Sequence, residues 1–154
     1  MRKKIIPLGR ASRLEPSWLK LETSVEAEVT SEDPAFPLES ALGIFPGPGW
    51  KAADAGSQAI RLYFDHALSL RRIFVEFHEE QRERSQEFVL LASGDRGQTW
   101  REIVRQHFNF SSAATREVED FNVELNDVTA LELQIIPDLA HRQAHATLRR
   151  LQIA

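Results

Sequence analysis

The chain has 154 residues, of which 42% are hydrophobic and 27% are charged, and its formal net charge is -4. These values are typical of one soluble globular domain, and the acidic balance argues against a general nucleic-acid binder, whose surface must neutralise phosphates. No run approaches the roughly 20 apolar residues of a membrane span. The absence of cysteine excludes disulfides, thiolate nucleophiles and cysteine-based zinc sites.

The first 22 residues are basic and irregular. Their positive charges include Arg2, Lys3, Lys4, Arg10 and Arg13. We expect an N-terminal extension over residues 1–22 that packs on or trails from the core, with Trp18, Leu19 and Leu21 as its anchors, and a domain over residues 23–154. The start lacks the roughly 7–15 apolar residues of a secretory signal, which predicts a cytoplasmic protein.

From residue 25 onward the hydrophobic period is two, as in half-buried strands. Val25, Ala27 and Val29 alternate with polar residues and predict the first strand. Residues 31–50 contain four prolines and predict a loop, in which only PLESAL favours a short helical turn. Seven further strands are predicted over AIRLYFD, LSLRRIFVEF, EFVLLAS, TWREIVRQHF, VEDFNVEL, ALELQIIP and HATLRRLQIA. About eight strands without a long helix indicate an all-β sandwich or barrel.

The stretch SGDRGQTWREI, from Ser93 to Ile103, separates two of these strands. Gly94 and Gly97 tolerate positive φ, and Asp95 can hydrogen-bond its own backbone, so the segment predicts a β-hairpin. Trp100 is expected to anchor this hairpin on or near the core.

Several motifs, in order, resemble the discoidin family, also called the coagulation factor 5/8 type C domain. They are VEAEVTS, DPAFPLESAL, the Trp of GPGWKA, AIRLYFD, LSLRRIFVEF, the hairpin SGDRGQTWREI with one inserted residue, and the closing ATLRRLQIA. The resemblance covers about residues 23–154 and implies an all-β fold of about eight antiparallel strands, the galactose-binding-like jelly-roll sandwich.

The resemblance also implies that a ligand binds loops at one end of the sandwich. The corresponding segments here are residues 31–36, 79–86 and 137–145. Guanidinium groups suit carboxylates, phosphates or vicinal hydroxyls, and an aromatic ring can stack on a sugar. The candidate ligand-binding residues are therefore Asp33, Phe36, Arg82, Arg84, His141 and Arg142. The family's calcium loop is not matched, since ALGIFPGPG lacks the expected aspartate, and the charged loop tips argue against membrane insertion.

Catalytic and cofactor motifs carry little weight. GPGWKA fits a dinucleotide-binding pattern only on paper, because it does not join a strand to a helix. His141 and His145 have zinc-ligand spacing only if they lie on one helix, and no nucleophile elbow is present. We expect no enzyme, cofactor or metal. The leading interpretation is a carbohydrate- or glycan-binding module. The alternative is a protein-interaction module or a subunit of a larger intracellular or phage-like assembly, and the oligomeric state stays open.

Overall fold

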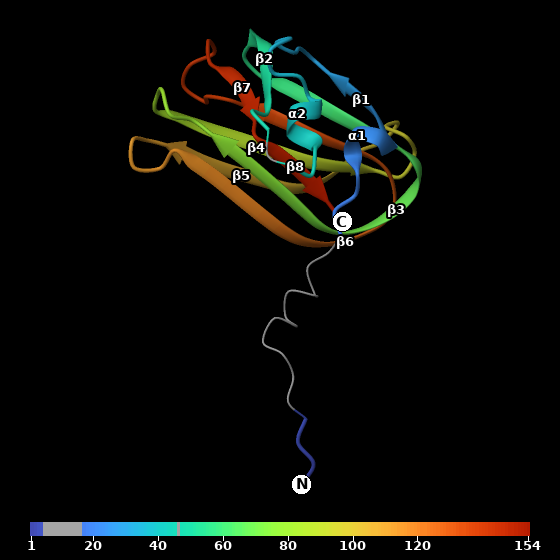
Figure 1. Ribbon diagram of the computed structural model, residues 1–154. Helices are drawn as coiled ribbons and strands as arrows, with labels where there is room; N and C mark the ends of the chain where they lie inside the picture. The colour runs from blue at the N-terminus through green and yellow to red at the C-terminus, as the bar shows by residue number, and fades with distance from the viewer. Residues whose placement is uncertain (5–16, 46) are drawn as a thin grey trace.

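The computed structural model describes residues 1–4, 17–45 and 47–154, and its strands form a β-sandwich (Figure 1). No helix in this part of the chain is long and apolar enough to cross a bilayer. The elements, in chain order, are α1 (Leu21–Ser24), β1 (Val25–Val29), α2 (Glu39–Leu42), β2 (Trp50–Ala55), β3 (Gln58–His78), β4 (Arg84–Ser93), β5 (Arg101–Phe110), β6 (Arg116–Ile136), β7 (His145–Leu148) and β8 (Arg150–Ile153).

Two long strands, β3 and β6, run through both layers of the sandwich. Residues 58–63 of β3 pair with residues 130–135 of β6, and residues 72–78 pair with residues 116–122. Between these two stretches the register shifts, and the strands turn from one layer into the other. The first layer has the order β1-β3-β6-β4-β5, β8 pairs the later half of β3, and β2 and β7 form a separate two-stranded sheet. The predicted all-β sandwich of about eight antiparallel strands is confirmed.

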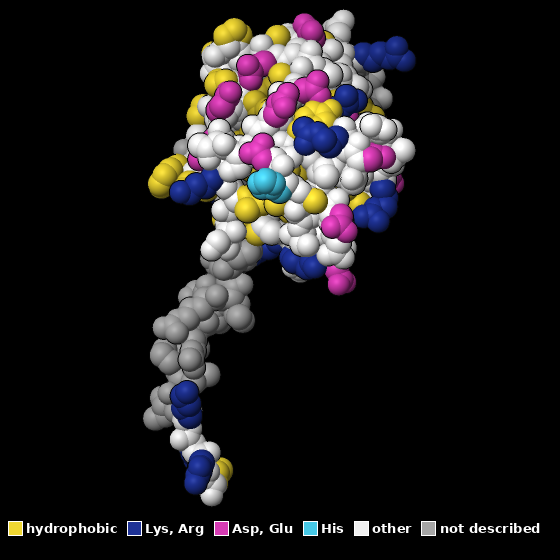
Figure 2. Space-filling view, turned by 90° about the vertical axis from the view of Figure 1, so that its right-hand side faces the viewer, with side chains coloured by type: hydrophobic (Ala, Val, Ile, Leu, Met, Phe, Trp, Pro, Cys, Tyr) yellow, Lys and Arg dark blue, Asp and Glu magenta, His cyan; other side chains and the backbone are white. Residues whose placement is uncertain are grey.

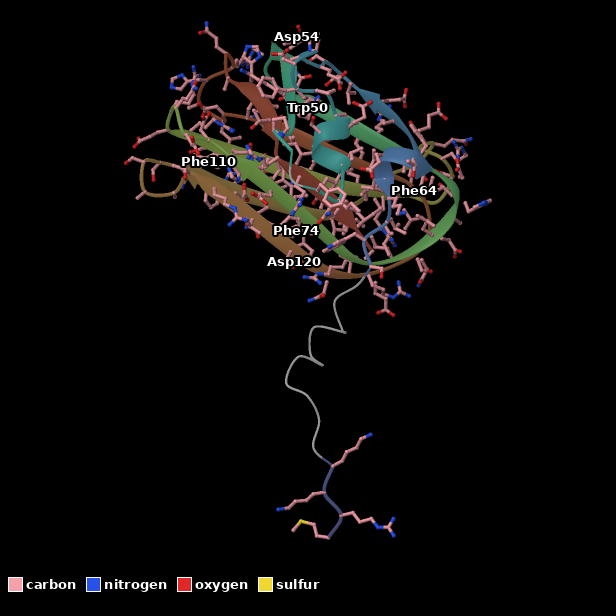
Figure 3. The ribbon with its side chains drawn as sticks, viewed as in Figure 1. Trp50, Asp54, Phe64, Phe74, Phe110 and Asp120 are labelled. Carbon is pink, nitrogen blue, oxygen red and sulfur yellow. The ribbon has the colours of Figure 1, made fainter. Side chains whose placement is uncertain are left out.

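Alternating apolar side chains fill the space between the layers. Phe77 from β3 and Phe88 from β4 meet across it with ring centroids 5.2 Å apart. Figure 3 shows Phe64 near the bend of β3 and Phe110 at the opposite end, where the loops gather. The largest fully buried side chains include Trp50, Ile60, Leu62, Ile73, Leu90, Leu131, Leu133 and Ile135. At about 25 cal/mol per Å² of apolar surface, this burial is the dominant force that holds the layers together.

The N-terminal segment is anchored on the domain by Trp18, by Leu19, which packs against the core, and by Leu21, which is buried in it. Trp18 lies with its ring centroid 6.2 Å from that of Phe74, and the Leu19 N–H donates to the carbonyl of Ile153 at 2.9 Å. Arg10 and Arg13 of the predicted extension lie outside the described residues. The boundary between residues 22 and 23 stays a prediction, because α1 crosses it.

The predicted hairpin joins β4 to β5. Asp95 accepts hydrogen bonds from Ser93 Oγ at 2.7 Å and from the Thr99 N–H at 2.9 Å. Gly97 has φ +86, and the inserted Arg96 also has a positive φ of 56. Trp100 is half-buried, with the guanidinium of Arg61 5.8 Å from its ring centroid. The hairpin prediction is therefore confirmed. Trp100 lies half-buried beside Arg61, at the edge of the core rather than inside it.

The bend end of the sandwich carries several acidic side chains. At the bend end, acidic side chains gather over the upper part of the surface (Figure 2). Glu26 and Glu28, both exposed on β1, contribute to the negative charge of the first layer. The opposite end carries the loops after β3, β5 and β6.

Candidate ligand-binding site

A hollow of about 380 Å³ opens where the loops meet the β2–β7 sheet. A second hollow of about 110 Å³ adjoins it and shares five of its lining residues. The larger hollow is lined by Phe36, by Lys51 of β2, by residues 78–82 from the end of β3 and the loop after it, and by Ala144, His145, Thr147 and Arg149 around β7. All three predicted loop segments thus contribute to one concave surface.

The first loop is fixed to β2 by backbone hydrogen bonds. The Asp33 N–H donates to the Lys51 carbonyl at 2.8 Å, and the Lys51 N–H donates to the Phe36 carbonyl at 3.2 Å. The Asp33 carboxylate accepts from the Ala35 N–H at 2.9 Å, as in an Asx turn. Asp33 therefore shapes the loop and does not line the hollow, whereas the half-buried ring of Phe36 forms part of its wall.

The second loop is organised by a buried ion pair. Arg84 is only 4% exposed, and its Nε donates to Glu79 Oε1 at 2.8 Å. Its Nη1 donates to Gln86 Oε1 at 2.9 Å and to the Pro137 carbonyl at 2.7 Å, and its guanidinium lies 4.5 Å from the Phe110 ring centroid. We expected Arg84 to face a ligand. The structure instead places it inside the fold, because it begins β4 on the same face as Phe88. Arg82, at the exposed tip, does line the hollow.

The third wall comes from β7 and from the end of β3. His145 Nδ1 lies 3.1 Å from the Ala52 carbonyl, which can only accept, so Nδ1 donates and Nε2 is left for another partner. His78 Nε2 lies 2.5 Å from Glu76 Oε2, which also accepts from Arg116 Nε at 3.1 Å. Burial raises the pKa of Glu76, but the hydrogen bonds from Arg116 and His78 outweigh it, so the carboxyl has a pKa below its ordinary value.

The predicted residues His141 and Arg142 are exposed and do not line the hollow. They lie farther along the third loop, where the Arg142 carbonyl is beside Gly56 in the turn between β2 and β3. The sequence analysis does not predict five residues that line the hollow: Lys51, His78, His145, Thr147 and Arg149. Strand alternation could have identified part of this set, since His145 and Thr147 alternate with the buried Ala146 and Leu148. The pairing of β2 with β7, which adds Lys51, has no local sequence signal.

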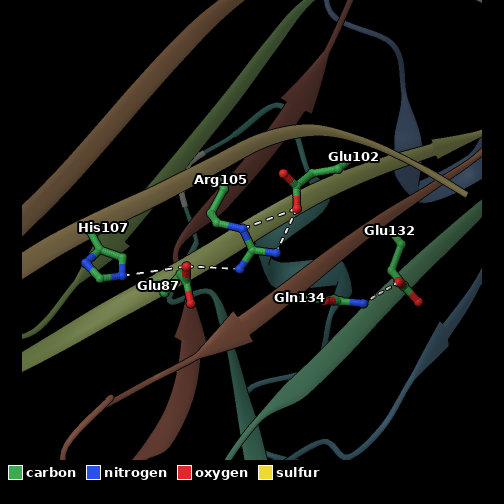
Figure 4. A network of polar contacts seen from close by, with 6 residues as sticks. All are labelled: Glu87, Glu102, Arg105, His107, Glu132 and Gln134. Carbon is green, nitrogen blue, oxygen red and sulfur yellow. Dashed lines mark hydrogen bonds and ion pairs between the residues drawn. The ribbon is translucent and has the colours of Figure 1, made fainter.

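A second polar network lies away from the hollow, on β4, β5 and β6 (Figure 4). Arg105 donates from Nη1 to Glu87 at 3.0 Å and from Nη2 to Glu102 at 2.7 Å. Gln134 donates to Glu132 at 2.9 Å. The Arg105–Glu87 pair joins the neighbouring strands β5 and β4, and such cross-strand pairs stabilise a sheet by roughly 0.2–1 kcal/mol. The Arg105–Glu102 and Gln134–Glu132 contacts each lie within one strand. Their role is structural.

One buried acid near the loop end is strongly perturbed. Glu117 is 1% exposed, and burial, followed by its hydrogen bond with Glu119, raises its pKa to about 8. Gln86 Nε2 donates to its Oε1 at 3.1 Å. Because Glu117 does not line the hollow, it cannot touch a ligand there. Among the described residues, no group of three or more His, Asp or Glu side chains is placed to hold a metal ion.

Comparison with known proteins gives structural neighbours only. No family model matches the chain, and no curated protein matches it by sequence. The family 32 carbohydrate-binding module of Clostridium perfringens NanJ, solved with galactose, aligns with a TM-score of 0.62 at 13% identity, over 87% of this chain and 96% of that one. The corresponding module of AlyQ, solved with 4,5-unsaturated mannuronic acid, gives 0.63 at 13% identity, over 85% and 95%.

A pectin-binding carbohydrate-binding module gives a TM-score of 0.61 at 16% identity, over 85% of this chain and 90% of that one. The chain has the jelly-roll fold of these modules. Discoidin domains share this fold, so the fold implied by the sequence motifs is confirmed, while the narrower discoidin family is not established. At these identities the likeness concerns the fold.

Proposed function

We propose that the protein is a non-catalytic carbohydrate-binding module whose ligand occupies the hollow between the loops and the β2–β7 sheet. The observation that carries this proposal is the composition of the hollow, in which an aromatic wall at Phe36 faces hydrogen-bonding side chains on three separate segments. Sugar rings are recognised by such walls together with a few well-placed polar groups. The neighbours with the same fold, solved with galactose or with an unsaturated mannuronic acid, support this choice.

The absence of catalysis is part of the proposal. Among the described residues, Glu79 and Glu80 are the carboxylates of the hollow, and Glu79 is committed to Arg84. Hydrolysis of a glycosidic bond usually requires two available carboxylates in defined positions. We therefore expect binding without turnover.

The direct test is a glycan array with the full chain, followed by titration calorimetry on each hit. Phe36→Ala and Arg82→Ala should abolish or weaken every hit, because both side chains line the hollow. Arg101→Ala is the matched control, since Arg101 is exposed at the start of β5, outside the hollow. No hit on neutral or acidic glycans would refute the proposal, and so would hits that survive both substitutions.

A second candidate, a protein-interaction module, is favoured by one surface feature. Phe45 is 79% exposed and Ile44 is 38% exposed, in the loop between α2 and β2. An exposed aromatic residue of this kind is typical of an interface anchor. A stoichiometric partner that is lost with Phe45→Ser and kept with Phe36→Ala would favour this function over glycan binding.

A further inference from the structure

The hollow differs in charge from the domain that carries it. Five of the 19 basic residues and one of the 23 acids lie in the first 16 residues. This leaves 14 basic against 22 acidic residues, a formal charge of -8, for residues 17–154. If the lining of the hollow had the average charge of residues 17–154, it would be acidic.

Three cations nevertheless line the hollow: Lys51, Arg82 and Arg149. Among the described residues, none of their side chains has an ion pair or hydrogen bond, whereas eight of the twelve arginines in residues 17–154 have at least one. The charge of Glu79 is offset by the buried Arg84 at 2.8 Å. Three unpaired cations therefore face one unpaired carboxylate, that of Glu80.

The lining also supplies uncharged donors. The Thr147 hydroxyl is buried and has no hydrogen-bond partner among the described residues. Thr147 pairs with Lys51 across the β2–β7 ladder, so these two side chains share a face. The hollow thus combines an aromatic wall at Phe36 with three unpaired cations.

We propose that the hollow selects a saccharide that bears a carboxylate, namely a uronic acid unit, with Arg82, Arg149 and Lys51 around the carboxylate and Phe36 against the ring. This proposal rests on the proposed carbohydrate-binding function and names its ligand class. Arginine forks match carboxylate geometry, and each such contact in a partly exposed site changes affinity by about 1.4- to fivefold.

The test uses the full chain and matched pairs of trisaccharides. Oligomers of galacturonic, glucuronic, mannuronic and guluronic acid are titrated beside their methyl esters, which keep the skeleton and remove the charge. At least one acid should bind at least about tenfold more tightly than its ester at low salt. That preference should shrink between about 50 and 500 mM NaCl, because screening shortens the Debye length to a few ångströms. Arg82→Gln/Arg149→Gln should lose the preference, and Arg101→Gln should keep it.

The outcomes separate the two proposals. Equal binding of acids and esters, or binding restricted to neutral sugars, overturns the anionic selectivity and leaves the carbohydrate-binding function standing. Binding of sulfated oligosaccharides without any uronide overturns the choice of carboxylate. An Arg101→Gln effect as large as that of the double variant overturns the assignment to the hollow. No binding of any glycan refutes the function and this inference together.

Discussion

The buried carboxyl of Glu117 makes a quantitative prediction about stability. Its pKa in the folded protein is about 8, against an ordinary value of 4.5. The unfolded chain therefore releases this proton first as the pH rises. Between about pH 4.5 and 8 the free energy of unfolding should fall by roughly 1.4 kcal/mol per pH unit, to a total of at most about 5 kcal/mol. Above pH 8 this contribution should level off, because both states are then ionised.

Glu117→Gln removes the ionisable carboxyl and keeps the size and shape of the side chain. A glutamine resembles the protonated acid, since its carbonyl oxygen can accept from Gln86 and its amide group carries no charge. We expect wild type and variant to have similar stability near pH 4.5. At pH 9 the variant should be more stable, by about 2–5 kcal/mol, because it buries no charge.

Urea unfolding at pH 4.5, 7 and 9, followed by the fluorescence of the buried Trp50, measures these differences. Glu124→Gln, an exposed acid on the same strand, is the control and should leave the pH dependence unchanged. The reasoning fails if Glu117→Gln and wild type lose stability in parallel from pH 4.5 to 9. It also fails if the variant is the less stable protein at pH 9.

Three further predictions concern single side chains. Gly49→Ala should destabilise the protein by about 2–3 kcal/mol in urea unfolding, because φ is +86 and a Cβ would lie 2.5 Å from the Leu148 carbonyl; an unchanged midpoint would contradict this. Phe36→Ala should weaken glycan binding about fivefold by calorimetry, because the ligand covers a half-exposed ring whose burial is worth about 1 kcal/mol. The melting temperature of the variant is the control, since a large drop in it together with the loss of affinity would indicate a folding defect instead. Asp95→Asn should lower the melting temperature at pH 6, because hydrogen bonds from Ser93 and Thr99 stabilise the ionised carboxylate and lower the pKa of Asp95 to about 2. The difference in melting temperature between wild type and variant should vanish as the pH falls through about 2. A difference that persists at lower pH would show that the charge is not responsible.

Period-two alternation predicted an all-β sandwich or barrel, because strands with one buried face must alternate. The family resemblance then favoured the sandwich. The bend of β3 was not predictable in the same way. The sequence predicts two separate strands at 59–65 and 68–77, because each half alternates by itself. Only the pairing with β6 shows that the strand is continuous. Loop positions followed from prolines and charges, and their convergence followed from the family resemblance.

The side chains of the site were predicted less well. The charged run around Arg84 predicts a loop, although the even spacing of Arg84 from Gln86 and Phe88 places it on the buried face of β4. Arg82 and Phe36 line the hollow, while Asp33, His141 and Arg142 do not; whether any of them contacts a ligand stays a prediction. Lys51 and Arg149 come together only through the β2–β7 ladder, a long-range pairing that no local pattern encodes.

The strand pairing described above also has a kinetic consequence. Gln58 pairs with Ile135 and Glu76 pairs with Arg150, and these long-range pairs must form before the two layers are complete. Contacts so distant along the chain require large loops to close first, and proteins dominated by them reach the native state in milliseconds to seconds. Until then the apolar faces and edges of incomplete sheets are exposed to neighbouring molecules, so aggregation during folding is the main hazard that this topology creates.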